Sequence, residues 1–259
     1  MNLVQLAINI GINTLPMLLL VLLAMALERL RPVDPPRLAA ARLNLPYLFV
    51  FGAGGTLTQL VLGTATVSAI NALGGGLIRL PSSGILLLPA FLAYLFTLDL
   101  LEYLFHRAQH RLPWLWAMHA LHHSDPAMNA STVDRHFWLE PAIKTVTIYL
   151  LAGLLFQTPG IILGMYSLLS FYHIVPHMNL RLGFGKGWWL LNSPQFHRIH
   201  HSALPQHYNC NFASLFPIYD RLFGTQYVPQ PDEYPPTGLA TQPENLWQAV
   251  TWPWRQPKS

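Results

Sequence analysis

Ten of the chain's twelve histidines fall in four short clusters. The clusters are His106-x3-His110, His119-x2-His122-His123, His173-x3-His177 and His197-x2-His200-His201. Residues three and four apart share one face of a helix, so each cluster can direct two imidazoles to one point, and the third imidazole of HxxHH points slightly aside. Neutral imidazole is a good ligand for Fe, Zn, Cu or Ni, whereas Mg and Ca prefer oxygen. The spacing therefore predicts a metal centre.

The number of imidazoles favours two metal ions over one. A single ion cannot use ten ligands, whereas two ions with about five ligands each keep positions open for a diatomic molecule. A lone histidine is more often an ordinary buried residue than a ligand, but that explanation would have to hold for four clusters at once. No HExxH motif of a metalloprotease is present. We predict as ligands His106, His110, His119, His122, His123, His173, His177, His197, His200 and His201.

The composition indicates a membrane protein. The chain is 52% hydrophobic and 10% charged, whereas an ordinary soluble domain is about one quarter charged. Residues 3–27, 45–73 and 85–105 form apolar runs of spanning length, since about 20 helical residues cross the hydrocarbon of a bilayer. Residues 141–176 are apolar but interrupted by Gln-Thr-Pro-Gly at 157–160, which predicts a short hairpin.

Basic residues set the expected orientation. Arg29, Arg31, Arg37 and Arg42 closely follow the first apolar run, so the positive-inside rule places that loop in the cytoplasm and the N-terminus outside. The first run has no basic segment before it and no small-residue cleavage site, which favours a retained helix over a signal peptide. With this topology all four clusters lie at the cytoplasmic face of a multi-pass protein, in the inner membrane if the source is bacterial.

The expected fold is an all-α integral membrane protein, with about four transmembrane helices, the last pair a short hairpin, and a cytosolic helical cap that holds a dimetal histidine site. We treat residues 1–259 as one membrane domain. Its parts are N-terminal transmembrane helices at 1–105, an interfacial His-rich segment at 106–140, a membrane hairpin at 141–178, a cytosolic cap at 179–228 and an extended Pro-rich tail at 229–259.

From Asp99 to Thr225 the chain resembles the fatty acid hydroxylase and sterol desaturase superfamily. The four histidine spacings carry the resemblance, together with the segment from Asn129 to Glu140 and the sequence Tyr-Asp-Arg-Leu-Phe-Gly-Thr at 219–225. The resemblance implies ten histidine ligands, two irons, use of O2 and a lipid-facing pocket under a cytosolic cap. It also implies hydroxylation or desaturation of a C–H bond in a fatty acyl, sterol or related lipid.

Several polar residues near the clusters could hydrogen-bond to the ligands and fix their tautomers. Asp99 precedes His106 by two turns at membrane depth, where an acid is costly without a purpose, and we expect it to bond to an imidazole. The other residues considered for this supporting role are Asn129, Arg135, His136, Glu140, His207 and Asp220.

The sequence is also compatible with other functions, and it indicates which partners the protein needs. A histidine-lined metal transporter or metal-binding membrane protein is the main alternative, and a haem electron carrier is a third. The metal could be iron or zinc, since imidazoles accept both. Cys210 is the single cysteine, so the chain has no iron-sulfur ligand set, and a separate ferredoxin or cytochrome-type donor must supply electrons. Scattered arginines without a basic block indicate no nucleic-acid partner.

Overall fold

The computed structural model describes residues 2–36 and 38–255. Arg37, one of the four arginines from which the orientation is predicted, and residues 256–259 of the predicted tail lie outside the described residues. The described chain is predominantly helical, which confirms the all-α expectation. Three of its helices are long and apolar enough to cross a membrane, namely Leu3–Glu28, Ala41–Ala72 and Leu87–Arg111. These three apolar helices are those of a membrane protein.

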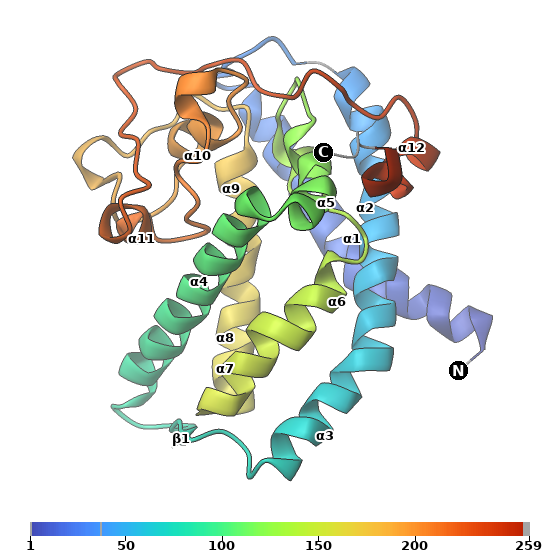
Figure 1. Ribbon diagram of the computed structural model, residues 1–259, viewed down its shortest axis with the longest axis vertical. Helices are drawn as coiled ribbons and strands as arrows, with labels where there is room; N and C mark the ends of the chain where they lie inside the picture. The colour runs from blue at the N-terminus through green and yellow to red at the C-terminus, as the bar shows by residue number, and fades with distance from the viewer. Residues whose placement is uncertain (1, 37, 256–259) are drawn as a thin grey trace.

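The first three helical passes run between two ends of the molecule (Figure 1). Helix α1 (Leu3–Glu28) leads from the N-terminus to the end where the histidines lie. Helix α2 (Leu38–Thr58), the π-helix η1 (Gln59–Gly63) and α3 (Thr64–Ala72) form one run back. After the short strand β1 (Ile78–Arg79), α4 (Leu87–Arg111) returns to the histidine end and carries His106 and His110 in its last turns.

Glycines in the second run allow close packing and do not break it. A Cβ on Gly54 would lie 2.2 Å from the carbonyl oxygen of Trp138, and one on Gly52 would lie 2.2 Å from Oγ1 of Thr14. The backbone of α2 therefore lies directly against α1 and against the segment that contains Trp138. This is the small-residue packing expected between helices in lipid.

The predicted hairpin is a pair of shorter helical passes. The descending half consists of α6 (Glu140–Lys144), the π-helix η3 (Thr145–Tyr149) and α7 (Leu150–Leu155). Strand β2 (Phe156–Gln157) pairs in parallel with β1, and α8 (Gly160–Ser170), η4 (Phe171–His173) and α9 (Ile174–His177) return. Neither half is among the three candidate spans of the described chain.

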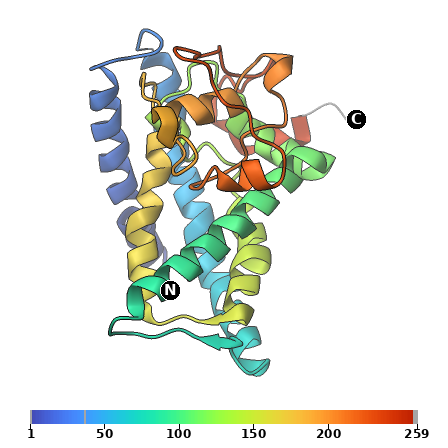
Figure 2. The ribbon, with the colours of Figure 1, turned by 90° about the vertical axis from the view of Figure 1, so that its left-hand side faces the viewer.

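Short helices and loops gather at the histidine end, above the long helices (Figure 2). They are α5 (Pro113–His123), η2 (Ala130–Thr132), η5 (Gly185–Gly187), α10 (Pro194–His200), η6 (Pro205–His207) and α11 (Ile218–Leu222). The buried Glu28 carboxylate anchors this layer to α1, because its Oε1 accepts hydrogen bonds from the backbone N–H groups of Ala130 at 2.6 Å and Asn179 at 2.8 Å.

The prediction of an extended tail is wrong for its last described part. The chain forms α12 (Leu246–Val250) and η7 (Trp252–Arg255) there. Asn245 caps α12 through its side-chain oxygen, and Ala249 and Trp252 are buried against Tyr47 of α2. The local cap and the buried apolar surface outweigh the proline content that suggested an extended chain.

Candidate metal centre

Nine of the ten predicted ligands converge in two groups. The five-histidine group consists of His106, His110, His119, His123 and His200, and the four-histidine group of His122, His177, His197 and His201. Within each group, one ring nitrogen per residue lies within 4.8 Å of all the others. Neighbouring Nε2 atoms are 3.2 Å apart between His110 and His123, and 3.1 Å apart between His122 and His177. Each group could hold a metal ion.

Both HxxHH clusters are divided between the two groups. On α5, His119 and His123 are one turn apart and join the five-histidine group, whereas His122 joins the other. On α10, His197 joins the four-histidine group and His200 joins the first. In each HxxHH cluster, the imidazole that points aside, His122 or His200, therefore belongs to the other group. Helices α5 and α10 thus each contribute histidines to both groups.

Backbone carbonyl groups orient several imidazoles. The Nδ1 atoms of His106, His200 and His177 lie 2.7 Å from the Phe212 oxygen, 2.8 Å from the Cys210 oxygen and 2.7 Å from the His173 oxygen. A carbonyl oxygen can only accept, so each Nδ1 carries the proton and each Nε2 presents a lone pair to its group.

Two of these lone pairs have no partner within the described chain. The Nε2 atoms of His106 and His200 are buried and accept no hydrogen bond there. A buried polar atom without a partner costs about 1–3 kcal/mol, and a bound cation would remove that cost. The residues present thus fit a metal ion with nitrogen ligands.

Burial keeps neutral those histidines of the two groups that lie outside the candidate membrane spans. Desolvation, followed by the neighbouring imidazoles, lowers the pKa of His122, His123 and His201 well below the usual value of histidine. Desolvation also lowers the pKa of His200 to about 4, although its hydrogen bond to the Cys210 carbonyl acts in the opposite direction. These imidazoles are unprotonated near neutral pH, as metal binding requires.

His173 lies outside both groups. Its Nε2 is 3.3 Å from the Ser214 hydroxyl, and its backbone oxygen accepts the hydrogen bond from His177. Of the ten histidines predicted as ligands, it is the one that the structure does not bring together with the others. Its ring still faces the cavity beside the two groups.

His136 and Glu140 lie against the two groups. The His136 ring stacks on His122, and its Nδ1 lies 3.1 Å from Oε2 of the buried Glu140. A ring nitrogen of His119, one of His136 and a Glu140 oxygen lie within 4.8 Å of one another. Of the polar residues predicted to support the ligands, these two approach them most directly.

The prediction that Asp99 forms a hydrogen bond with an imidazole is wrong. The Asp99 carboxylate accepts from the backbone N–H groups of Leu215 and Phe216, both at 2.9 Å. Asp220 likewise accepts from the N–H groups of Phe212 and Ala213, both at 2.8 Å. Because the Phe212 carbonyl accepts from His106, Asp220 is connected to that imidazole through the loop and not by direct contact.

Three further residues considered for the supporting role have other partners. The side chain of Asn129 caps η2 by accepting from the Ser131 N–H. Arg135 donates to the Asn44 and Ser124 side chains. The Nδ1 of His207 lies 2.9 Å from the Ser202 hydroxyl. No hydrogen bond joins Asn129, Arg135 or His207 to either histidine group in residues 2–36 and 38–255.

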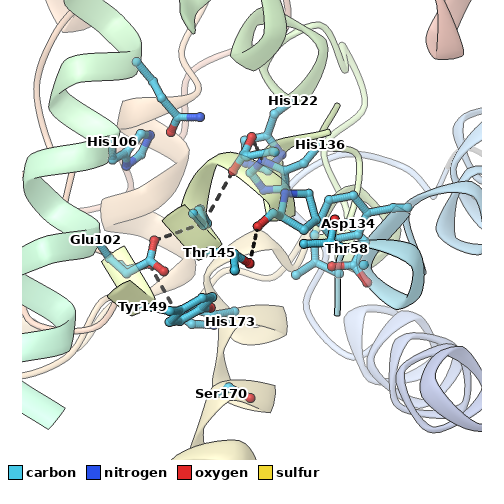
Figure 3. Close-up of a pocket in the computed structure, with 18 of the residues that line it drawn as sticks. Thr58, Glu102, His106, His122, Asp134, His136, Thr145, Tyr149, Ser170 and His173 are labelled. Carbon is cyan, nitrogen blue, oxygen red and sulfur yellow. Dashed lines mark hydrogen bonds and ion pairs between the residues drawn. The ribbon is translucent and has the colours of Figure 1, made fainter. Parts of the chain in front are cut away.

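A cavity of about 640 Å³ opens beside both groups, and His106, His119 and His122 line it. Figure 3 shows Glu102, Asp134 and Tyr149 around the same space. Lys144 lies between two carboxylates, with its Nζ 3.0 Å from Glu102 and 3.4 Å from Glu140. Lys144 is not among the site residues predicted from the sequence, although a charged residue in an apolar segment is a signal of function.

The structure thus defines a membrane protein with two histidine groups that could hold metal ions beside a cavity. Residues 91–225 match the family model described as Fatty acid hydroxylase. Since this match covers more than half of the chain, the protein belongs to the fatty acid hydroxylase family, which confirms the resemblance identified from the histidine spacings.

Similar proteins include lipid oxygenases from animals and bacteria. Alkylglycerol monooxygenase of Caenorhabditis elegans is 31% identical over 156 residues, which are 60% of this chain and 30% of that protein. Alkylglycerol monooxygenase of Danio rerio is 34% identical over 135 residues, 52% of this chain and 30% of that protein. Ornithine lipid hydroxylase OlsE of Rhizobium tropici is 28% identical over 131 residues, 49% of this chain and 38% of that protein.

The chain thus aligns with less than half the length of these relatives. No solved structure matches it.

Proposed function

We propose that this protein is a membrane-bound, non-haem dimetal oxygenase that hydroxylates a C–H bond of a lipid, with O2 and externally supplied electrons. The observation that carries the proposal is the pair of largely buried histidine groups beside a cavity that reaches into the apolar helices. The family membership and the names of the relatives support lipid hydroxylation over desaturation.

We assign the two metal sites to the five-histidine and four-histidine groups. Iron is the proposed native metal, and it would supply the redox chemistry that activates O2. The chain's own part is to orient the imidazoles through Phe212 and Cys210, to keep them neutral by burial, and to hold a lipid beside them with water excluded. A metal ion held by the four-histidine group would have more room for a further ligand than one held by the five-histidine group.

The lipid would enter from the bilayer, since the cavity lies among apolar helices. Alkylglycerols and ornithine lipids, which the names of the relatives specify, are the first substrates to test. A separate ferredoxin or cytochrome-type protein would deliver electrons. We place the metal centre on the cytoplasmic side and the N-terminus outside, on the argument from Arg29, Arg31 and Arg42.

Lipid mass spectrometry of cells with and without the gene tests this function. The expected result is a lipid that gains one oxygen atom in the presence of the protein and not with His122→Ala. The matched control is His207→Gln, which changes a histidine outside both groups. A product that lacks two hydrogens would indicate desaturation. Metal binding without any lipid change that depends on His122 would contradict the oxygenase and favour the metal-transport or metal-binding alternative.

A further inference from the structure

Arg198 lies on α10 between two proposed metal ligands, His197 and His200, and its side chain is buried. Its guanidinium forms an ion pair with the carboxylate of Asp34, and its Nε donates a hydrogen bond to the Pro235 carbonyl oxygen at 2.8 Å. Asp34 belongs to the loop between α1 and α2, 164 positions earlier in the chain, and its side chain is 46% exposed. The ion pair thus joins α10 to a surface loop that carries no metal ligand.

The backbone of Asp34 holds the segment that follows α9. Its N–H donates to Oδ1 of Asn179 at 3.0 Å, and its carbonyl oxygen accepts from Nδ2 of Asn179 at 2.8 Å. Asn179 is two residues after the proposed ligand His177, and its own N–H donates to Glu28 at 2.8 Å. Asp34 is therefore bonded both to α10 and to the chain just beyond α9.

The ends of α9 and α10 supply three of the four histidines in the four-histidine group, namely His177, His197 and His201. The Nε2 atoms of His177 and His197 lie 3.1 Å apart, a separation that depends on how the two helices are placed against each other. The five-histidine group takes only His200 from α10, and its other members lie on α4 and α5. The contacts of Asp34 therefore bear mainly on one of the two groups.

The charge of Asp34 bears on the same group. A buried guanidinium that loses its counter-ion is strongly unfavourable, and Asp34 is the one acid of the described residues that pairs with Arg198. A metal ion bound by His197 would be a second cation close to this guanidinium, since His197 and Arg198 are adjacent in the chain, and the two cations would repel each other. The Asp34 carboxylate offsets this repulsion.

We infer that Asp34 and Arg198 are positioning residues for the metal ion of the four-histidine group. Their ion pair fixes α10 against the end of α9 and neutralises the guanidinium beside the ion. This inference rests on the proposed function, which assigns one ion to each group. Loss of the carboxylate should weaken metal binding by the four-histidine group about ten- to hundred-fold, the range found for residues that orient metal ligands, and should leave the five-histidine group almost unaffected.

Zinc binding by the purified protein in detergent tests this inference, because zinc accepts imidazole ligands without redox chemistry. Apo-protein is titrated with zinc buffered by nitrilotriacetate, and the ions bound per chain are counted by mass spectrometry. Asp34→Asn should raise one of the two dissociation constants about ten- to hundred-fold. Asp34→Glu, which keeps the carboxylate, should recover most of the affinity. Asp232→Asn, the same change at an exposed position, is the matched control and should bind zinc like the unmodified protein.

The His122→Ala background identifies the weakened site. His122→Ala lacks a ligand of the four-histidine group and should retain the ion of the five-histidine group, so adding Asp34→Asn should not change the remaining zinc affinity. A further loss in this background, or equal weakening of both sites by Asp34→Asn alone, would show general destabilisation and overturn the inference. Two unchanged dissociation constants in Asp34→Asn would overturn it as well.

Lipid products distinguish a failure of this inference from a failure of the proposed function. Selective loss of one zinc ion in Asp34→Asn, without any oxygenated lipid in cells that carry the gene, would support the positioning role and contradict the oxygenase. Unchanged zinc binding in Asp34→Asn, with an oxygenated lipid in those cells, would overturn the positioning role alone.

Discussion

The ring of His136 lies parallel to the ring of His122, with centroids 4.0 Å apart and 17° between the planes. His122 belongs to the four-histidine group, whereas His136 belongs to neither of the two main groups. The Nδ1 of His136 points instead to Glu140. The stacked ring of His136 thus restricts the orientation of His122, a proposed ligand, and is not itself proposed as a ligand.

Replacing His136 with phenylalanine should preserve metal binding. His136→Phe keeps an aromatic ring against His122 and removes only the ring nitrogens, so the purified protein should still contain about two metal ions per chain. His122→Ala should lose the ion of the four-histidine group. Elemental analysis of both variants checks this, and loss of an ion from His136→Phe would make His136 a ligand.

His173 and His177 should differ in their importance for the metals. They come from the same HxxxH cluster, but only His177 joins a group, and His173 contributes its backbone oxygen, which any residue can supply. His173→Ala should therefore keep both ions, and His177→Ala should retain about one. Equal losses in the two variants would show that His173 is a fifth ligand of the second site.

Asp220→Asn should destabilise the protein through the loop that orients His106. The fully buried carboxylate accepts from two backbone N–H groups and from the Thr225 hydroxyl, and an amide cannot accept from both N–H groups equally. We expect a loss of roughly 2 kcal/mol in unfolding free energy, typical of hydrogen bonds to charged groups, and weaker metal retention.

Thermal unfolding in detergent, with metal content measured in parallel, tests the role of Asp220. Asp232→Asn is the matched control, since Asp232 is exposed and its φ of 59° suits asparagine. If Asp220→Asn unfolds at the same temperature as the control, the loop does not depend on this carboxylate.

Alkylation of Cys210 should depend on pH in an unusual way. Burial raises the pKa of this thiol to about 12, whereas an exposed cysteine has a pKa of about 8.5. Because the thiolate is the reactive form, iodoacetamide at pH 8.5 should modify the folded protein very slowly and the denatured protein fast, with the folded rate rising only toward pH 12. The chain has a single cysteine, so intact mass reports the site directly. A native rate equal to the denatured rate would contradict the raised pKa of this thiol.

The sequence was sufficient to predict the three long apolar helices and to identify the histidine clusters because both depend on local spacing. Apolar runs of about 20 residues and histidines one helical turn apart are visible without tertiary information. The division of each HxxHH cluster between two groups depends on how α5 and α10 meet α4 and α9, which no local pattern encodes. The exclusion of His173 from both groups was likewise not predictable, because His173 and His177 have the same spacing as His106 and His110, which both join a group.

The partners of the acidic residues were not predictable either. Asp99 bonds to the backbone of Leu215 and Phe216, more than a hundred positions away, and backbone groups carry no residue signature. The backbone carbonyl groups of Phe212 and Cys210 orient His106 and His200. These partners were not predictable for the same reason. Lys144 did carry a signal, as a charge in an apolar segment, and its partners Glu102 and Glu140 are themselves rare acids of that region.

The metal content per chain of protein purified in detergent tests whether each of the two groups of imidazoles holds one metal ion. It is determined by inductively coupled plasma mass spectrometry against quantitative amino-acid analysis. We expect about two ions per chain, of a metal that accepts nitrogen ligands. One ion per chain, or none after growth with added iron, would contradict the assignment of one ion to each group.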